Sequence, residues 1–360
     1  MKTIIEQIDI RQMNMDIIRR AGEILRAGGL TAFPTETVYG LGADALNELA
    51  AKKIYAAKGR PSDNPLIVHI ADMEALGRIA EDVPEQAKAA ADAFWPGPLT
   101  MIFKKTEAVP LGTTGGLDTV AVRMPDHEAA RELIRAGGGY IAAPSANTSG
   151  RPSPTTAQHV EEDLAGRIDM IVDGGAVEIG VESTILDMTV EPPMILRPGA
   201  VTREMLEEVI GEVAVDKTLL DSVSHTAPKA PGMKYRHYAP KAEMTVVEGE
   251  TDQVMCVIDR LAREKIAGGF KVGIIAAEDT AGRYGTGEVK CIGARGDEAA
   301  IASHLYGILR DFDSIGTDYI YSEAFGREGI GTAVMNRLLK AAGQRVIDAG
   351  DFTGRREKNV

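Results

Sequence analysis

The sequence contains little cysteine: Cys256 and Cys291 are the only two among 360 residues. Two thiols are too few for a disulfide framework or for a zinc site built on thiolates. Each lies in an apolar segment, so we expect both thiols to be buried and inert. No Ser/His/Asp arrangement, no pair of carboxylates placed for acid–base chemistry and no cluster of metal ligands stands out, so we expect the protein itself to hold no metal.

Positive charge and long apolar runs are also scarce. The chain has 40 Lys and Arg against 53 Asp and Glu, a net charge of −13. This balance argues against binding nucleic acid mainly through phosphates, although a local basic pocket for a small anion stays possible. No window approaches the ~20 apolar residues of a membrane span, and residues 1–6 carry charge where a signal peptide needs an apolar run. We therefore expect a cytoplasmic protein.

The length and the residue pattern predict two α/β domains. Residues 1–205 form the first domain, and residues 206–241 form a linker rich in prolines, cations and aromatics. Residues 242–350 form a second, smaller domain, and residues 351–360 are a polar tail that we expect to fray. The second domain shows a Rossmann-type alternation, with strands at 244–247, 272–276, 289–292 and 319–322 and helices at 254–266, 298–312 and 333–342.

One stretch of the first domain concentrates unusual chemistry. Lys58 and Arg60 flank Gly59 at the end of a predicted helix, and a polar loop then leads into a strand at residues 66–70. Cations at a helix C-terminus can simply compensate the helix dipole, and this alternative stays open for the pair. Arg123 stands near the end of another strand, where a structural salt bridge is an equal alternative.

Loops rich in small hydroxyl residues separate Lys58, Arg60, Arg123 and a fourth cation, Arg197, and the longest of these loops is 144–154. Lys and Arg neutralise an anion while hydroxyls and backbone N–H groups orient it, so this set suits a phosphate together with a carboxylate. Long polar loops inside a compact domain are usually functional. The chain has no Walker A sequence, so ATP would need a different cradle.

Six segments, taken together and in order, resemble the YrdC-domain family in its long, two-domain form, the threonylcarbamoyl-AMP synthases. They are residues 34–41, 58–60, 94–100, 144–147, 183–184 and 231–240. The resemblance implies an α/β fold: a YrdC-like twisted mixed sheet with helices, followed by a smaller Rossmann-like domain. It also implies a nucleotidyltransferase that makes L-threonylcarbamoyl-adenylate and pyrophosphate from L-threonine, bicarbonate or CO2, and ATP. That product serves N6-threonylcarbamoyladenosine formation at position 37 of tRNAs that read codons starting with A.

The same resemblance implies roles residue by residue. Lys58 and Arg60 would be catalytic. L-Threonine would be held by Thr35, His69, Arg123, Ala143 and Ser183, with Arg123 pairing its carboxylate. ATP would be bound by Lys58, Ser62, Thr119, Ser145, Asn147, Ser153, Arg197, Tyr235 and His237. Mg2+ would come with ATP and be held mainly by the phosphates, and residues 235–238 of the linker would cover the pocket as a lid.

The implied partners are the three small-molecule substrates and the transferase machinery that modifies tRNA, with weak or no direct tRNA binding and no membrane. Two other functions are alternatives to this one. A non-catalytic RNA-binding module is disfavoured by the acidic net charge. A carbamoyl-transfer module of the hydrogenase-maturation type carries cysteine-rich zinc motifs, which two cysteines cannot supply.

Overall fold

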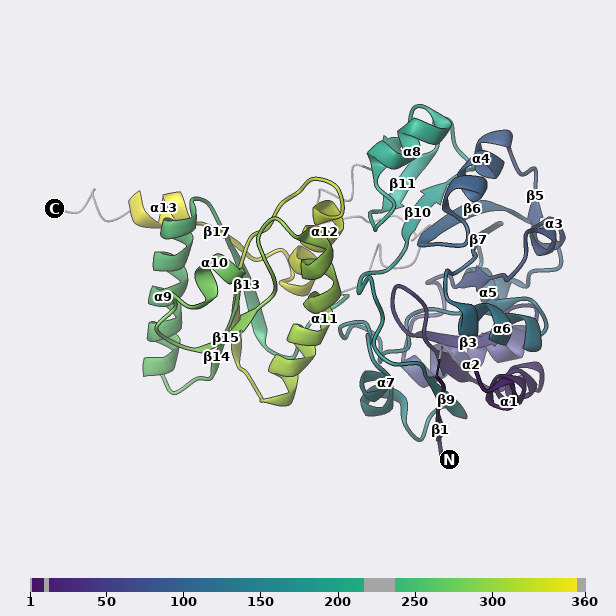
Figure 1. The fold of residues 1–360 in the computed structure, drawn as a ribbon, viewed down its shortest axis with the longest axis horizontal. Coiled ribbons are helices and arrows are strands. Elements are labelled where there is room, and N and C mark those ends of the chain that lie inside the picture. Colours follow the sequence, from purple (N-terminus) through teal and green to yellow (C-terminus); the bar gives the residue numbers. More distant parts are fainter. Residues whose placement is uncertain (1, 10–12, 217–236, 355–360) are drawn as a thin grey trace. The chain divides into compact units, whose positions relative to one another are not determined.

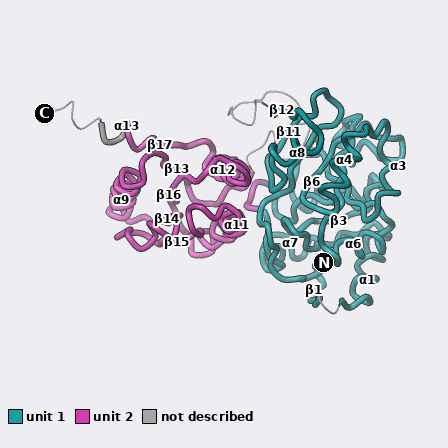
Figure 2. The backbone as a smooth tube through the Cα atoms, turned by 45° about the horizontal axis from the view of Figure 1, so that its top comes forward, with its two compact units in different colours: residues 1–149, 153–235 teal, residues 150–152, 236–360 magenta. Residues whose placement is uncertain are grey.

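The computed structural model describes residues 2–9, 13–216 and 237–354. The chain forms two compact units (Figure 2): Met1–Ser149 with Ser153–Tyr235, and Gly150–Pro152 with Arg236–Val360. The domain boundary expected at residue 205 falls inside helix α8, which belongs to the first unit. Residues 217–236, which hold Tyr235, most of the expected linker and half of the expected lid, lie outside the described residues.

The first unit is built on a mixed sheet of 12 strands (Figure 1) in the order β1-β9-β2-β3-β8-β4-β7-β6-β10-β11-β12, with β5 paired to β6. The strands are β1 (Ile4–Gln7), β2 (Thr31–Phe33), β3 (Gly40–Asp44), β4 (Ile67–His69), β5 (Ala80–Glu81), β6 (Leu99–Lys105), β7 (Thr119–Arg123), β8 (Ile141–Ala142), β9 (Met170–Asp173), β10 (Thr184–Asp187), β11 (Met194–Arg197) and β12 (Ala214–Val215). The helices are α1 (Met15–Arg26), α2 (Glu48–Lys58), α3 (Leu76–Ile79), α4 (Glu85–Phe94), α5 (Leu111–Thr114), α6 (Glu128–Ala136), α7 (Ala157–Leu164) and α8 (Arg203–Ile210). The predicted mixed sheet with helices is confirmed.

The middle of this sheet has two different faces, because successive side chains of a strand point to opposite sides. On one face, Val68 of β4 and Val122 of β7 belong to a large apolar core that also includes residues of helices α2 and α4. The opposite face carries His69 and Thr100 on either side of Arg123, in register on three neighbouring strands.

Helices cover the second face only in part. Helices α1 and α6 pack there on Phe33 of β2, Ile141 of β8 and Met170 of β9. Over β4, β7, β6, β10 and β11 the face carries a small apolar cluster to which the described residues contribute no helix: Ile67, Ile102, Ala121, Ile185 and Leu196. The row formed by His69, Arg123 and Thr100 therefore lies on the part of the sheet that no core helix covers, where polar loops can meet it.

The second unit has a parallel sheet of 5 strands in the order β15-β14-β16-β13-β17. Helices α9 and α13 lie on one face of it, and α11 and α12 on the other (Figure 1). The elements are β13 (Glu243–Glu248), α9 (Thr251–Ala267), β14 (Val272–Ala276), α10 (Glu278–Ala281), β15 (Glu288–Cys291), α11 (Glu298–Ser314), β16 (Tyr319–Glu323), α12 (Gly331–Ala341), β17 (Val346–Asp348) and α13 (Ala349–Gly354). The Rossmann-like prediction is confirmed, but it missed α10, β17 and α13, and α13 takes in residues 351–354 of the expected polar tail.

Residues 150–152 of the long polar loop belong to the second unit, far along the sequence from its other residues. Arg310 Nη2 donates to Pro152 O at 2.6 Å, and Arg151 Nη2 lies 3.3 Å from Asp313 Oδ2. Arg310 and Asp313 are buried residues of α11. These two contacts explain why residues 150–152 belong to the second unit.

The expectation of buried cysteines is wrong, because both thiols are exposed. Cys256 lies on the solvent side of α9, whose core side carries Val254, Val257 and Ile258. Cys291 ends β15, which is an edge strand. Apolar neighbours in the sequence therefore do not determine whether a cysteine side chain faces the core or the solvent.

Candidate functional site

Lys58 is the point at which helix α2 meets the polar loop after β8. The helix ends at Gly59, whose left-handed backbone (φ 63°) favours glycine. Lys58 is buried, and its Nζ donates to Ser145 O, to Asn147 O at 2.5 Å and to Asn147 Oδ1 at 3.3 Å. A buried ammonium group needs such acceptors, because burying it without them is costly. Three residues proposed for ATP, Lys58, Ser145 and Asn147, are thus brought together.

Arg60 and Ser62 follow in the loop that leads to β4. The Arg60 guanidinium is buried and donates to two carbonyls of its own loop: Nε to Asn64 O at 3.3 Å and Nη2 to Pro65 O at 3.1 Å. Ser62 is exposed. These bonds fix the shape of the loop immediately after Lys58, which is a structural task for Arg60 whatever else it does.

The loop between β2 and β3 folds against the helix-free part of the sheet. Thr35 Oγ1 accepts from the N–H groups of Thr37 (3.2 Å) and Val38 (3.3 Å), a hydroxyl turn that holds the loop in a bend. The hydroxyls of Thr35 and Thr37 lie 2.8 Å apart, and Arg123 Nη1 donates to Thr37 Oγ1 at 2.9 Å. A chain of hydroxyls therefore runs from the loop to the guanidinium at the end of β7.

Arg123 has an ion-pair partner that the sequence analysis did not identify. Its Nη2 lies 2.7 Å from Glu36 Oε1, and both side chains are buried. The two groups are not aligned as a hydrogen bond, and neither oxygen of Glu36 has a hydrogen-bond partner in the described part of the chain. A buried pair repays its desolvation only when its geometry is good and hydrogen bonds complete it. Arg123 and Glu36 thus offer a cation and an anion, each with bonding capacity left.

His69 stands beside Arg123 as a neutral group. Burial, and then the charge of Arg123, lower its pKa to about 3, although hydrogen bonds to the carbonyls of Ile67 and Ile141 oppose the shift. Its Nδ1 lies 3.2 Å from Ile67 O, and its ring meets the ring of Phe33 edge-on at 6.4 Å. At neutral pH the imidazole can orient a ligand by a hydrogen bond, but it adds no charge.

Ser183 and Arg197 form a third group, next to the row on the sheet. Ser183 Oγ lies 2.8 Å from Thr100 Oγ1 and accepts from Arg197 Nη2 at 3.1 Å. Arg197 Nε also donates to Ser183 O at 3.0 Å. Since Thr100 neighbours Arg123 in the sheet, the structure places Arg197 with residues proposed for threonine, although the resemblance implied a contact with ATP.

The other proposed residues are more scattered. Ala143 is buried and its N–H donates to Ile67 O at 2.9 Å. Ser153 Oγ donates to Glu182 Oε1 at 2.5 Å, and Glu182 is the residue directly before Ser183. Thr119 begins β7, so it stands about 13 Å along the strand from Arg123. His237 belongs to the second unit, where its ring packs against that of Tyr238 at 5.6 Å.

The residues that sequence reasoning missed are Glu36, Thr37, Thr100 and Glu182. Glu36, Thr37 and Thr100 lie inside the segments that carried the resemblance. Glu36 could have been found from the sequence, because it is a carboxylate in a hydroxyl-rich loop. Arg123, which lies in a strand of the same domain, needs such a group as its counter-charge.

Residues 2–9, 13–216 and 237–354 lack two kinds of feature. No helix there is long and apolar enough to cross a membrane. No group of three or more His, Cys, Asp or Glu is placed there to hold a metal ion.

Two family models match the chain. One, Sua5_yciO_yrdC, described as "Telomere recombination", matches residues 23–199, and the other, described as "Threonylcarbamoyl-AMP synthase, C-terminal domain", matches residues 201–343. The threonylcarbamoyl-AMP synthase of Pyrococcus abyssi is 53% identical over 330 residues, 92% of this chain and 95% of that protein. The threonylcarbamoyl-AMP synthase of Bacillus subtilis is 52% identical over 331 residues, 92% of this chain and 94% of that protein.

A solved structure agrees with these matches. The crystal structure of Pyrococcus abyssi Sua5 complexed with L-threonine has a TM-score of 0.91 to this chain at 50% identity, and the match covers 96% of this chain and 99% of that one. The likeness extends over both compact units. The chain therefore belongs to the threonylcarbamoyl-AMP synthase family, nucleotidyltransferases of the YrdC type that act in threonylcarbamoyladenosine formation on tRNA.

Proposed function

We propose that the chain joins L-threonine, bicarbonate or CO2, and ATP into L-threonylcarbamoyl-adenylate with release of pyrophosphate. The observation that carries this proposal is the row His69, Arg123 and Thr100 on the helix-free part of the sheet, with the hydroxyls of residues 35 and 37 against it. Membership of the family, and the L-threonine complex of the Pyrococcus abyssi relative, support the same reaction.

For L-threonine, Arg123 would pair with the carboxylate and Glu36 would accept the ammonium group. A zwitterion would then exchange one poorly aligned internal ion pair for two ion pairs with the substrate, which is the reason for adding Glu36 to the residues that the resemblance implied. The neutral His69 would orient the substrate without competing for its carboxylate. The remaining threonine residues would be Thr35, Ala143 and Ser183.

For ATP, the group formed by Lys58, Ser145 and Asn147 would receive the phosphates. Lys58 would be catalytic, because it is a buried cation in the group that we propose for the phosphates, and Arg60 would act by fixing the loop behind it. The other nucleotide contacts would come from Ser62, Thr119, Ser153, Arg197, Tyr235 and His237. Mg2+ would accompany ATP, and phosphate oxygens would be its main ligands.

The chemistry requires positioning and charge neutralisation more than covalent help from the protein. Glu36 would take a proton from the threonine ammonium, and the resulting amine would form an N–C bond to CO2, supplied as such or by loss of water from protonated bicarbonate. The nitrogen would then lose a second proton to water, giving a carbamate. A carbamate oxygen would then attack the α-phosphorus of ATP, forming an O–P bond as the bond to pyrophosphate breaks. Lys58 would stabilise the negative charge on the phosphates during that displacement.

The product is a mixed anhydride that water destroys, so we propose that it passes to the transferase machinery that modifies tRNA. We also propose that the reaction takes place in the cytoplasm. Direct tRNA binding is not needed for it, and the net charge of −13 disfavours such binding.

Pyrophosphate release tests the proposal. Release should require ATP, L-threonine and bicarbonate together, and Lys58→Met, which keeps the side-chain volume, should abolish it. Lys52→Met is the matched control, because Lys52 is an exposed residue of the same helix. Release without threonine, or full release by Lys58→Met, would contradict the proposal.

A further inference from the structure

The second unit has a topological switch point between β13 and β16, which are neighbours in its sheet. β13 is followed by α9 on one face and leads to β14, whereas β16 is followed by α12 on the other face and leads to β17 (Figure 1). The two connections thus leave adjacent strands in opposite directions. In open parallel α/β sheets, ligands bind outside the carboxyl ends of the strands at such a point.

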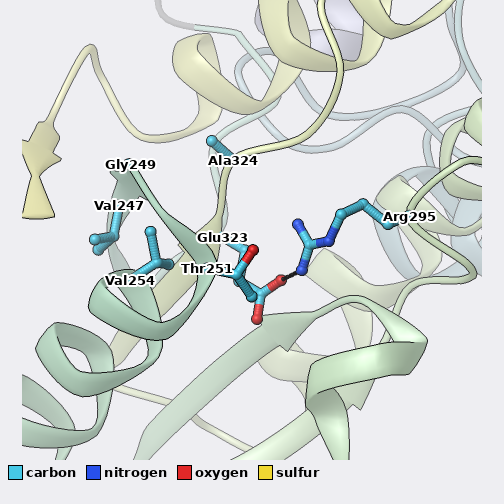
Figure 3. Close-up of a pocket in the computed structure, with 7 residues that line it drawn as sticks. All are labelled: Val247, Gly249, Thr251, Val254, Arg295, Glu323 and Ala324. Atoms are coloured by element: carbon cyan, nitrogen blue, oxygen red, sulfur yellow. Dashed lines mark hydrogen bonds and ion pairs between the residues drawn. The ribbon is translucent and has the colours of Figure 1, made fainter.

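A cavity lies at this point (Figure 3). Its walls are the end of β13 with the start of α9, the end of β16, and Arg295: Val247, Gly249, Thr251, Val254, Arg295, Glu323 and Ala324. The cavity measures about 20 Å³, room for one water-sized group, and about 210 Å³ with its open mouth. Position 249 requires glycine, because φ is 132° and a Cβ there would lie 3.2 Å from Ala349 Cβ.

Glu323 anchors the cavity wall, since it is 1% exposed and both of its oxygens are already bonded. Oε1 accepts from Tyr284 OH at 2.8 Å, and Oε2 accepts from Arg295 Nη2 at 2.5 Å and from Ala277 N at 3.3 Å. Burial and the charge of Glu323 raise the pKa of Tyr284, so its hydroxyl keeps its proton and donates. Glu323 therefore holds Arg295 at the cavity, where Figure 3 shows the two side chains meeting.

The groups left with bonding capacity at the cavity include N–H donors. Arg295 is one-third exposed and also donates through Nε to Asp279 at 3.3 Å, but its Nη1 has no partner within residues 237–354. At the start of α9, Glu250 makes no capping bond through its side chain. The N–H group of the lining residue Thr251, and that of Asp252, the next residue of α9, likewise have no hydrogen-bond partner in that range.

We propose that this cavity binds the planar O–C–O⁻ group of a small monoanion, either hydrogencarbonate or the carboxylate of an amino acid. The two oxygens of such a group can accept hydrogen bonds from Nη1 of Arg295 and from the N–H groups at the start of α9 at the same time. The small volume admits only the tip of the ligand, and the rest would occupy the mouth. The carboxylates of Glu250 and Asp252 are exposed and disfavour a dianion such as phosphate. The site would give the second unit a ligand of its own, whereas the proposed adenylation chemistry involves few residues of that unit.

Amide NMR of the full-length 15N-labelled protein tests this proposal, with acetate, hydrogencarbonate, L-threonine and phosphate as separate probes at constant pH and ionic strength. We expect saturable shifts of the amides of Thr251 and Asp252 with acetate. Hydrogencarbonate and L-threonine then distinguish the two sources, because the natural ligand should shift the same amides at lower concentration than acetate. Phosphate should be at least tenfold weaker, the equivalent of 1.4 kcal/mol.

Two variants and a control complete the test. Ala324→Leu fills the cavity without removing a donor and should abolish the shifts. Thr251→Pro removes one N–H at the first helical position, where proline fits, and should weaken binding without disturbing the fold. Ala299→Leu, the same change at an exposed site on α11, should leave the shifts intact. Shifts confined to first-unit amides, or unaltered in Ala324→Leu, would overturn the proposal and leave the proposed function standing. An equal response to phosphate would overturn the assignment to carboxylates.

Discussion

Replacing Glu36 by glutamine removes one charge from the buried pair with Arg123 and changes almost no volume. If Glu36 accepts the ammonium group of L-threonine, the variant loses a charge-assisted hydrogen bond worth about 1.5–3 kcal/mol. Each 1.4 kcal/mol is a factor of ten, so the KM for L-threonine should rise roughly 10- to 150-fold. The KM for ATP should not change, because the group around Lys58 is untouched.

The same change should lower the stability of the free protein. Breaking a buried ion pair by removing one partner costs about 3–5 kcal/mol, since the other charge stays buried. The pair of Arg123 and Glu36 lacks an aligned hydrogen bond, so we expect the lower end, about 3 kcal/mol of unfolding free energy. Denaturant unfolding measures this loss separately from the kinetics.

A second ligand separates two possible effects of Glu36. The analogue 2,3-dihydroxybutanoate keeps the carboxylate of threonine but has a hydroxyl in place of the ammonium. It should inhibit Glu36→Gln as well as or better than the parent protein, because Arg123 loses its internal competitor. Pyrophosphate release with both ligands is the assay, and Glu128→Gln, an exposed residue at the start of α6, is the control. If threonine and the analogue both bind more tightly to Glu36→Gln, Glu36 merely occupies Arg123 and our reasoning is wrong.

Three further outcomes are expected. Asp313→Asn should weaken the contact of α11 with residues 150–152 and raise the KM for ATP about fivefold, the equivalent of one hydrogen bond of about 1 kcal/mol. Asp311→Asn, on the exposed side of the same helix, is the control and should leave the KM unchanged. Equal effects of the two substitutions would contradict this prediction. The His69 pKa of about 3 lies below the ordinary 6.5, so the folded protein binds fewer protons between these values and its unfolding free energy falls as pH falls through that window. His69→Gln should therefore remove up to about 1.4 kcal/mol per pH unit from the slope seen in urea unfolding, and an unaltered slope would contradict the assignment. Cys256 and Cys291 should both react with a thiol reagent in the native protein, and a requirement for denaturant would show that they are not exposed.

Local signals in the sequence predicted the elements that carry the site. Gly59 after a helical pattern located the end of α2, and with it Lys58. The apolar run at residues 66–70 predicted β4. The alternation of strand and helix patterns after residue 242 predicted the α/β sheet of the second unit, which is parallel. Each of these patterns depends only on neighbours within a few residues, so the sequence shows it directly.

Pairings between distant segments could not be predicted in the same way. Glu36 pairs with Arg123 because the loop after β2 folds onto the sheet, and no local pattern records that contact. Residues 150–152 belong to the second unit through side chains of α11, about 160 residues later in the chain. The thiol of Cys256 is exposed because α9 presents another side to its core, which composition does not reveal.

The most direct test of the central claim follows two labels into one product. The protein is incubated with [14C]bicarbonate and [α-32P]ATP, with and without L-threonine, and the nucleotides are separated rapidly because the product is labile. We expect one new nucleotide that carries both labels in equal amounts and forms only when threonine is present. A labelled nucleotide without 14C, or one that forms without threonine, would contradict the synthesis of threonylcarbamoyl-adenylate by this chain.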